Sequence, residues 1–262
     1  MPDTKFAAAN PLQPRRRAIL VGASSGIGAS LARRLVREGY QVAVLARREE
    51  LLKALCEQIN RESGETRALY YVHDVTYFDQ VHGLLQHILE DLGGLDLFIY
   101  NTGITVAVKR TEFNFAADRQ MLETNLLGAM AWLNPVAAIF QNLKAGQIVG
   151  IGSVAGDRGR IGAPAYNTSK AGLHTYLEAL RNRLTRHGVT VLTVKPGFVD
   201  TDMLKSASTN RPFLVSSTEQ AVEGIWKAIK ARKQTVYVLG LWGMIMLIVR
   251  HIPSVIFRRL SF

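Results

Sequence analysis

Residues 18–28 read Ala-Ile-Leu-Val-Gly-Ala-Ser-Ser-Gly-Ile-Gly, so an apolar run leads directly into a glycine-rich turn. The run 18–21 predicts a buried strand, and residues 27–39 follow with helical periodicity and end on a glycine. Glycines let the backbone of a tight turn approach a pyrophosphate, and the following helix offers it N–H groups. The spacing is G-x-x-x-G-x-G, and its place between strand and helix favours a dinucleotide site over a purely structural turn.

Outward from this turn, strand-like and helix-like patterns alternate through most of the 262-residue chain. Further strands are predicted at 42–45, 69–72, 95–100, 148–151, 189–194 and from 236, with helices at 49–61, 79–91, 118–143, 164–186 and 217–232. Apolar strands that alternate with helices imply a parallel sheet joined by right-handed crossovers. We therefore expect the α/β class, with a single Rossmann-fold domain over 15–240 that is doubly wound and has helices on both faces. A flexible segment 1–14 is expected before it, and an apolar and basic extension 241–262 after it.

The predicted second strand ends in Leu45-Ala46-Arg47-Arg48, where the ribose of a bound adenosine would lie. An acid there would bind the 2′-hydroxyl of NAD, whereas arginine pairs with a 2′-phosphate. Arg47 and Arg48 therefore favour NADP(H) over NAD(H), the alternative being two solvated residues that start a helix. Asp74 ends the third strand, and its carboxylate either accepts from an adenine amino group or caps the next helix.

Three residues in the second half of the chain indicate proton transfer. Ser153 follows the predicted strand 148–151, and Tyr166 and Lys170 are four residues apart, on one face of a predicted helix. Hydride transfer to a ketone leaves an alkoxide that needs a proton, and a phenol whose pKa is lowered by a neighbouring ammonium can donate it. Ser153 would hydrogen-bond the carbonyl oxygen and orient it. Each residue alone is ordinary, but the combination downstream of a nucleotide turn indicates a catalytic site.

With these motifs, the chain resembles the short-chain dehydrogenase/reductase family over roughly residues 15–240. The resemblance implies hydride transfer between a nicotinamide cofactor and a ketone or secondary alcohol. In this family Tyr166 would be the acid/base, Lys170 would also hold the nicotinamide ribose, and Asn125 would complete the catalytic set through a water-linked proton path. The cofactor-binding residues that we expect are Gly22, Ser24, Ser25, Gly26, Ile27, Gly28, Arg47, Arg48, Asp74, Val75, Asn101, Thr102, Gly103, Tyr166, Lys170, Pro196, Gly197, Val199 and Thr201.

A narrower resemblance concerns the substrate. Residues 153–158 and 250–259 look like those of the decaprenylphosphoryl-2-keto-ribose reductases, which reduce the 2-keto group of a polyprenyl-phosphate-linked pentose. This implies a lipid-linked ketone, whereas a 3-oxoacyl or steroid-type ketone reductase acting on a small molecule is the alternative. A non-catalytic NADP(H)-sensing regulator on the same fold is a third hypothesis, which the intact Ser153, Tyr166 and Lys170 disfavour. The family resemblance also implies a homodimer or homotetramer built through the helices 118–143 and 164–186.

Positive charge is concentrated at the ends of the chain. The formal net charge is +11, yet residues 21–223 are nearly neutral, while 224–262 hold seven Lys and Arg and no Asp or Glu. A nucleic-acid-binding domain would carry its excess on the body, so no nucleic-acid partner is expected. Residues 236–249 carry no charge but are too few to span a membrane, which takes about 20. Because 241–249 is apolar on every side, it should be buried in protein or in lipid. The tail is therefore either an interfacial membrane segment or a pocket lid or subunit contact.

Cysteine, histidine and the N-terminal region add little further chemistry. Cys56 is the only cysteine, which excludes an internal disulfide and indicates a reducing compartment. Residues 1–17 lack the apolar stretch of a secretory signal. The six histidines show no ligand spacing, so no metal is expected. We expect a cytoplasmic protein, with peripheral membrane attachment through the tail as an open alternative.

Overall fold

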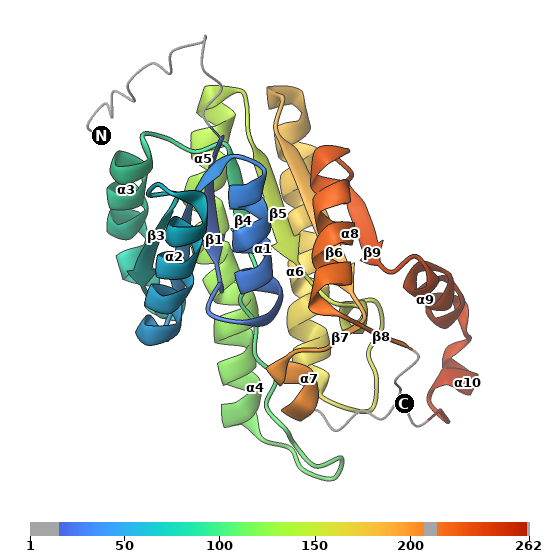
Figure 1. The fold of residues 1–262 in the computed structure, drawn as a ribbon. Helices are drawn as coiled ribbons and strands as arrows, with labels where there is room; N and C mark the ends of the chain where they lie inside the picture. Colours follow the sequence, from blue (N-terminus) through green and yellow to red (C-terminus); the bar gives the residue numbers. More distant parts are fainter. Residues whose placement is uncertain (1–15, 207–213, 261–262) are drawn as a thin grey trace.

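The structure is a computed structural model that describes residues 16–206 and 214–260, without the side chains of residues 205 and 206 (Figure 1). The predicted flexible segment 1–14 lies outside the described residues. The centre of the fold is a seven-stranded sheet in the order β3-β2-β1-β4-β5-β6-β9, and every neighbouring pair is parallel. The strands are β1 (Arg16–Val21), β2 (Tyr40–Ala46), β3 (Ala68–Val72), β4 (Leu97–Tyr100), β5 (Gln147–Ile151), β6 (Thr190–Pro196) and β9 (Thr235–Val238).

Helices cover both faces of this sheet. One face carries α1 (Gly26–Arg37), α2 (Glu49–Ser63) and α8 (Thr218–Lys230), and the other carries α3 (Val81–Leu92), α5 (Gly128–Leu143) and α6 (Pro164–Leu184). The predicted α/β class and doubly wound parallel sheet are confirmed. The predicted boundaries lie within three residues of those in the structure. The elements longer than predicted are β1, β2, β3, β5, β6 and α2, and the shorter ones are β4, α1, α3, α6 and α8.

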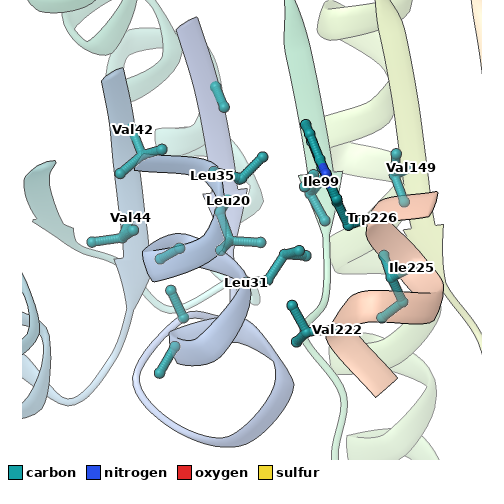
Figure 2. Close-up of a cluster of buried hydrophobic side chains, with 14 of the residues drawn as sticks. Leu20, Leu31, Leu35, Val42, Val44, Ile99, Val149, Val222, Ile225 and Trp226 are labelled. Carbon is teal, nitrogen blue, oxygen red and sulfur yellow. The ribbon is translucent and has the colours of Figure 1, made fainter. Parts of the chain in front are cut away.

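The alternation of side chains along each strand builds two cores. In β1, Ala18 and Leu20 face one side of the sheet, while Ile19 and Val21 face the other. Figure 2 shows the first core, in which Leu31 of α1 and Ile225 of α8 lie over the sheet. Because both faces are buried, the central strands carry runs of consecutive apolar residues, which is the pattern that identifies a parallel sheet in the sequence.

The long helix predicted at 118–143 is one helical run, Phe115–Leu143, that contains a π-helical turn. The structure has α4 (Phe115–Leu122), a π-helical turn η2 (Glu123–Leu127) and then α5. The run Phe115–Leu143 is long and apolar enough to cross a membrane, but Trp132, Leu133 and Phe140 of α5 pack fully buried in the second core. These residues therefore explain its apolar composition by contact with the sheet.

The last part of the chain adds elements beyond the sheet edge. A small parallel pair, β7 (Phe198–Val199) and β8 (Val215–Ser216), lies near α7 (Asp202–Ser206), and the sequence patterns missed all three. After β9 come α9 (Leu241–His251) and α10 (Ser254–Phe257), at the right-hand edge of Figure 1. Three short 3-10 turns, η1 (Phe78–Gln80), η3 (Val154–Gly156) and η4 (Thr185–His187), complete the described elements.

Candidate active site

A cavity of about 990 Å³ opens where the parallel strands end. Its walls come from the turn after β1, the segments that follow β2, β3, β4, β5 and β6, the start of α6, and the helices α7 and α9. Open parallel sheets bind ligands outside the carboxyl ends of their strands, so the cavity lies where the fold itself favours a site.

The glycine-rich turn after β1 is closed by contacts that leave no room for side chains. A Cβ at Gly28 would lie 2.1 Å from the Gly22 carbonyl oxygen, and that oxygen accepts a hydrogen bond from Asn101 Nδ2 at 2.6 Å. Gly22 has φ +92°, a left-handed conformation that favours glycine. Ser25 is the N-cap of α1 but its side chain makes no capping hydrogen bond, and the first turn holds no acid. The turn therefore has the form of a cradle for an anionic group at the start of α1.

Arg48 joins this turn to the end of β2. Its Nη2 donates to the hydroxyl oxygens of Ser24 at 2.8 Å and Ser25 at 2.6 Å, and its Nε also donates to Ser24. Arg48 is itself the N-cap of α2 and is exposed at the cavity wall. One guanidinium and two hydroxyls thus form a polar group of the kind that binds a phosphate.

Asp74 closes the turn that follows β3 and does not cap a helix, because the N-cap of the next helical turn, η1, is Tyr77. Its Oδ1 accepts from the backbone N–H and the hydroxyl of Thr76 at 3.0 and 2.8 Å, and its Oδ2 lies 3.5 Å from Arg47 Nη1. Burial raises the pKa of this carboxyl, but the Thr76 hydrogen bonds and the Arg47 charge outweigh it and leave the pKa below its ordinary value. Asp74 also lines the cavity, so the contact with an adenine stays a prediction.

Most of the other predicted cofactor residues line the same cavity, and Gly28 supports the turn from behind it. Those that line it are Gly22, Ser24, Ser25, Gly26, Ile27, Arg47, Arg48, Val75, Asn101, Thr102, Gly103, Pro196, Gly197, Val199 and Thr201.

Ser153, Tyr166 and Lys170 meet at the cavity from two elements. Ser153 directly follows β5 as the N-cap of η3, and its hydroxyl oxygen accepts from Ala155 N–H at 3.1 Å. Tyr166 and Lys170 project from the first turns of α6, with Lys170 Nζ 5.9 Å from the centre of the Tyr166 ring. Lys170 Nζ donates to the Ile151 carbonyl at 3.2 Å, which fixes the ammonium beneath the site. The structure thus brings the three predicted catalytic residues together.

The electrostatics of Tyr166 involve a residue that the sequence analysis missed. Burial raises the pKa of Tyr166, while its hydrogen bond with Ser153 and the charge of Arg160 lower it in part. Arg160 lines the cavity, its buried Nε has no hydrogen-bond partner among the described residues, and burial lowers its own pKa. Burial also lowers the pKa of Lys170 to about 8. Arg160 is therefore a second cation that favours the Tyr166 phenolate, and the effect of Lys170 on the Tyr166 pKa stays a prediction.

Asn125 does not line the cavity. It lies fully buried in the π turn η2, where its Oδ1 accepts from Ile104 N–H at 2.7 Å and its Nδ2 donates to the Ile104 carbonyl and to Ser169 Oγ. Its amide therefore ties the loop after β4 to α6, and the predicted water-linked proton path stays a prediction.

A buried polar network supports Ser153 from the side away from the cavity. Ser153 N–H donates to His174 Nε2 at 3.4 Å, and His174 Nδ1 lies 3.6 Å from Asp157 Oδ1. Asp157 also accepts from Lys195 Nζ at 2.5 Å and from Tyr237 Oη at 2.6 Å. Burial and the Lys195 charge lower the pKa of His174 to about 3, so the ring is neutral and Nδ1 carries its proton toward Asp157. The network could not be predicted from sequence, because its supporting residues follow no regular spacing. They are Asp157, His174, Lys195 and Tyr237.

Within the residues 16–206 and 214–260, no group of three or more His, Cys, Asp or Glu side chains is placed to hold a metal ion.

The sequence of this chain matches a known protein family over most of its length. Residues 16–212 match the family described as short chain dehydrogenase, which is more than half of the chain. The chain belongs to the short-chain dehydrogenase family. Its members are oxidoreductases. The narrower resemblance to the keto-ribose reductases, which concerns the substrate, stays a prediction.

Individual relatives of this short-chain dehydrogenase agree with the assignment. An uncharacterized oxidoreductase of Myxococcus xanthus is 35% identical over 214 residues, which cover 82% of this chain and 83% of the relative. The ketoacyl reductase HetN of a Nostoc species is 30% identical over 223 residues, covering 84% and 77%. A short-chain dehydrogenase from Sphingobium yanoikuyae, solved in complex with NADPH, superposes with a TM-score of 0.78 at 24% identity and covers 91% of this chain and 97% of that one.

Proposed function

We propose that this short-chain dehydrogenase is an NADPH-dependent carbonyl reductase, which works as an alcohol dehydrogenase in the reverse direction. The observation that carries the proposal is the convergence of Ser153, Tyr166 and Lys170 on one cavity with the glycine-rich turn and Arg48. A phenol, a hydroxyl and an ammonium at one end of a nucleotide cradle are the groups that reversible ketone reduction needs.

The residues present fit a nicotinamide dinucleotide phosphate. A side chain at Gly28 would close the cradle, α1 begins without a side-chain cap, and Arg48 with Ser24 and Ser25 offers donors to a phosphate on the ribose. When bound, the cofactor supplies or accepts the hydride. The NADPH in the Sphingobium protein supports the choice of cofactor by analogy.

The side chains of the chain itself would perform the proton transfer. The Ser153 hydroxyl, held in place by Ala155 N–H, would donate to the substrate carbonyl and orient it. As the oxygen gains negative charge, the Tyr166 hydroxyl would donate its proton to it, which leaves a phenolate beside the Arg160 guanidinium. Lys170, fixed by the Ile151 carbonyl beneath Tyr166, would hold the ribose hydroxyls.

The substrate part of the cavity is largely apolar. Its wall opposite the cradle is formed by Val154, Leu214 and the inner face of α9, with Trp242 and Met246. This wall suits the apolar body of an acyl chain, a sterol or a lipid tail. The ketoacyl reductase relative supports a 3-oxoacyl substrate, and the 2-keto group of a lipid-linked sugar is the second candidate that fits the same wall.

Steady-state oxidation of NADPH with a panel of ketones tests the proposed function. The panel contains a short soluble ketone, a 3-oxoacyl thioester and a steroid ketone, with NADH as the comparison cofactor. We expect ketone-dependent oxidation of NADPH with at least one member. NADPH binding without turnover on any of them would favour the sensing regulator and contradict the proposal.

Replacing Arg48 tests the cofactor preference. In Arg48→Ala we expect the KM for NADPH to rise about 10- to 100-fold, because a hydrogen bond to a charged group contributes about 1.5–3 kcal/mol. The KM for NADH should change little, since NADH lacks the ribose phosphate. The exposed Lys53 on the same helix gives the matched control Lys53→Ala, which should leave both values unchanged. An equal effect of Arg48→Ala on both cofactors would contradict the role assigned to Arg48.

Replacing Arg160 tests the electrostatics of Tyr166. Loss of the positive charge in Arg160→Gln disfavours the phenolate and so raises the pKa of Tyr166 further. In the alcohol-oxidation direction Tyr166 must be deprotonated, so we expect the rising limb of the kcat–pH profile to move to higher pH. Arg33→Gln is the matched control, since Arg33 is a half-buried residue of α1 that donates a hydrogen bond to Gln58, outside the cavity. A profile that stays in place or moves to lower pH would rule out this contribution of Arg160.

A further inference from the structure

Helix α9 has two faces of different character. Trp242 and Met246 are buried on its inner face and pack with Val154 and Leu214. The outer face is also apolar but open to solvent, with Met244 and Leu247 each 62% and Ile248 68% exposed. The apolar composition of 241–249 predicts that the whole segment is buried in protein or in lipid. In the structure, the protein buries only the side chains on the inner face of α9. The outer face is therefore an apolar surface that the rest of the described chain does not cover.

The exposed apolar surface continues beyond α9 into α10. The next exposed apolar side chains are Val255 and Ile256 of α10 and Leu260 after it. Soluble monomers rarely leave so many large apolar side chains together on one surface, so such a surface indicates a partner. We call the outer faces of α9 and α10, with Leu260, the C-terminal apolar surface.

The charges around this surface are of one sign. Arg250, Arg258 and Arg259 are exposed beside it, and the chain holds no Asp or Glu after Glu223. Arg250 contacts Tyr237 at the base of the surface. Cations beside bulky apolar side chains, on a tail without acids, are complementary to a surface that is apolar inside and anionic outside.

We propose that the C-terminal apolar surface docks on an anionic lipid bilayer, with α9 and α10 lying in the interface. The two helices have 11 and 4 residues, too few for a span, but enough to place an apolar face among lipid acyl chains. A second copy of the chain is a poorer occupant. In a symmetric dimer the same surface meets itself, so the arginines of both copies would lie together with no acid of the tail between them.

The inner face of the same helix forms part of the cavity wall. Trp242, Ile245, Met246 and Val249 line the cavity that holds Tyr166. Arg158 connects the end of α9 to the segment that follows Ser153. Its guanidinium donates hydrogen bonds to the carbonyls of Val249, Arg250 and Ile252. Docking therefore brings one wall of the active site to the lipid surface. The substrate class that follows is a ketone on an apolar molecule resident in the membrane, an extension that rests on the proposed function.

Flotation with vesicles tests the docking directly and requires no activity. Full-length protein is mixed with vesicles of phosphatidylcholine, or of equimolar phosphatidylcholine and phosphatidylglycerol, and separated on a density gradient. We expect the protein to float with the anionic vesicles, to float less with neutral ones and to be released by high salt. Failure of the wild-type protein to float with the anionic vesicles would overturn the proposal.

A double variant, Leu247→Glu with Ile248→Glu, should reduce the bound fraction about tenfold or more, because it puts two carboxylates into the apolar face. Neither residue lines the cavity, so the variant should keep its thermal unfolding temperature and its affinity for NADPH. Leu51→Glu is the matched control, since Leu51 is an exposed leucine of α2 at the opposite edge of the sheet. Undiminished flotation of the double variant would contradict the docking surface. Self-association of wild-type protein that the double variant abolishes, with no flotation of either, would identify a second copy as the occupant and overturn the proposal.

A second readout tests the substrate class. A long-chain ketone is incorporated in the anionic vesicles, and a short-chain ketone is supplied in solution, both with NADPH. The double variant should lose kcat/KM for the vesicle ketone by about tenfold or more and keep kcat/KM for the soluble one. Equal values for both proteins on the vesicle ketone would refute the substrate class. Absence of turnover on every ketone, with flotation intact, would refute the proposed function and leave the docking in place.

Discussion

Tyr166→Phe is expected to lower ketone turnover by about 10²- to 10⁴-fold while the Kd for NADPH, measured by fluorescence titration, stays unchanged. Phenylalanine keeps the ring that packs at the start of α6 and removes only the hydroxyl that would give its proton to the alkoxide. The contribution of a positioned acid is lost, whereas the glycine-rich turn and Arg48 remain as they are.

Tyr176→Phe is the matched control for this variant. Tyr176 belongs to the same helix, and its hydroxyl donates to Asn134 at 3.0 Å on the surface, away from the cavity. Its removal should leave kcat and the NADPH affinity unchanged. If Tyr166→Phe kept wild-type turnover, Tyr166 would not be the proton donor and the assignment of the site would be wrong.

Gly28→Ala is expected to have the second large effect, on the cofactor site and on folding. The added Cβ would lie 2.1 Å from the backbone oxygen of Gly22, which cannot move without breaking its hydrogen bond to Asn101. Overpacking of this kind costs about 1–3 kcal/mol of stability. If the turn opens to relieve the contact, a loss of about 3 kcal/mol in binding would weaken the NADPH affinity about 100-fold.

Gly83→Ala is the control that separates this effect from glycine replacement as such. Gly83 is an exposed residue of α3, and a Cβ there would meet nothing within 4 Å. Alanine should stabilise the helix by about 0.4–1 kcal/mol and leave the NADPH affinity unchanged. Thermal unfolding and cofactor titration of both variants check the pair. An unchanged NADPH affinity in Gly28→Ala would show that the closed turn is not needed to bind the cofactor.

The sheet could be predicted from sequence because both of its faces are buried. Val42 and Val44 pack with α1 and α2, while Ala43 and Leu45 pack with the helices of the other face, so the stretch 42–45 is apolar and short. The same argument fails at α9, where residues 241–249 are apolar on all sides and the pattern cannot indicate which side meets protein. The π turn at Glu123–Leu127 also has no signal in the apolar periodicity.

In the candidate site, too, some residues could be predicted from sequence and others could not. Ser153, Tyr166 and Lys170 could be found because their spacing places them near one helix end and one strand end. Arg160 could not, since its position depends on how the loop between η3 and α6 folds back over the cavity. Asp157 and Lys195 are 38 residues apart and meet only because β5 and β6 are neighbours in the sheet.

The attachment of Arg158 to α9 has a consequence for the order of events during synthesis. The nearest of its three carbonyl partners is 91 residues further along the chain, so the ribosome adds these partners long after Arg158. The strands β1 to β4 with their helices can assemble while the chain is still growing. The loop that begins at Ser153 receives this support only after α9 has been added. A nascent chain that ends before α9 can therefore form the nucleotide half of the fold, but it lacks the contact between Arg158 and α9.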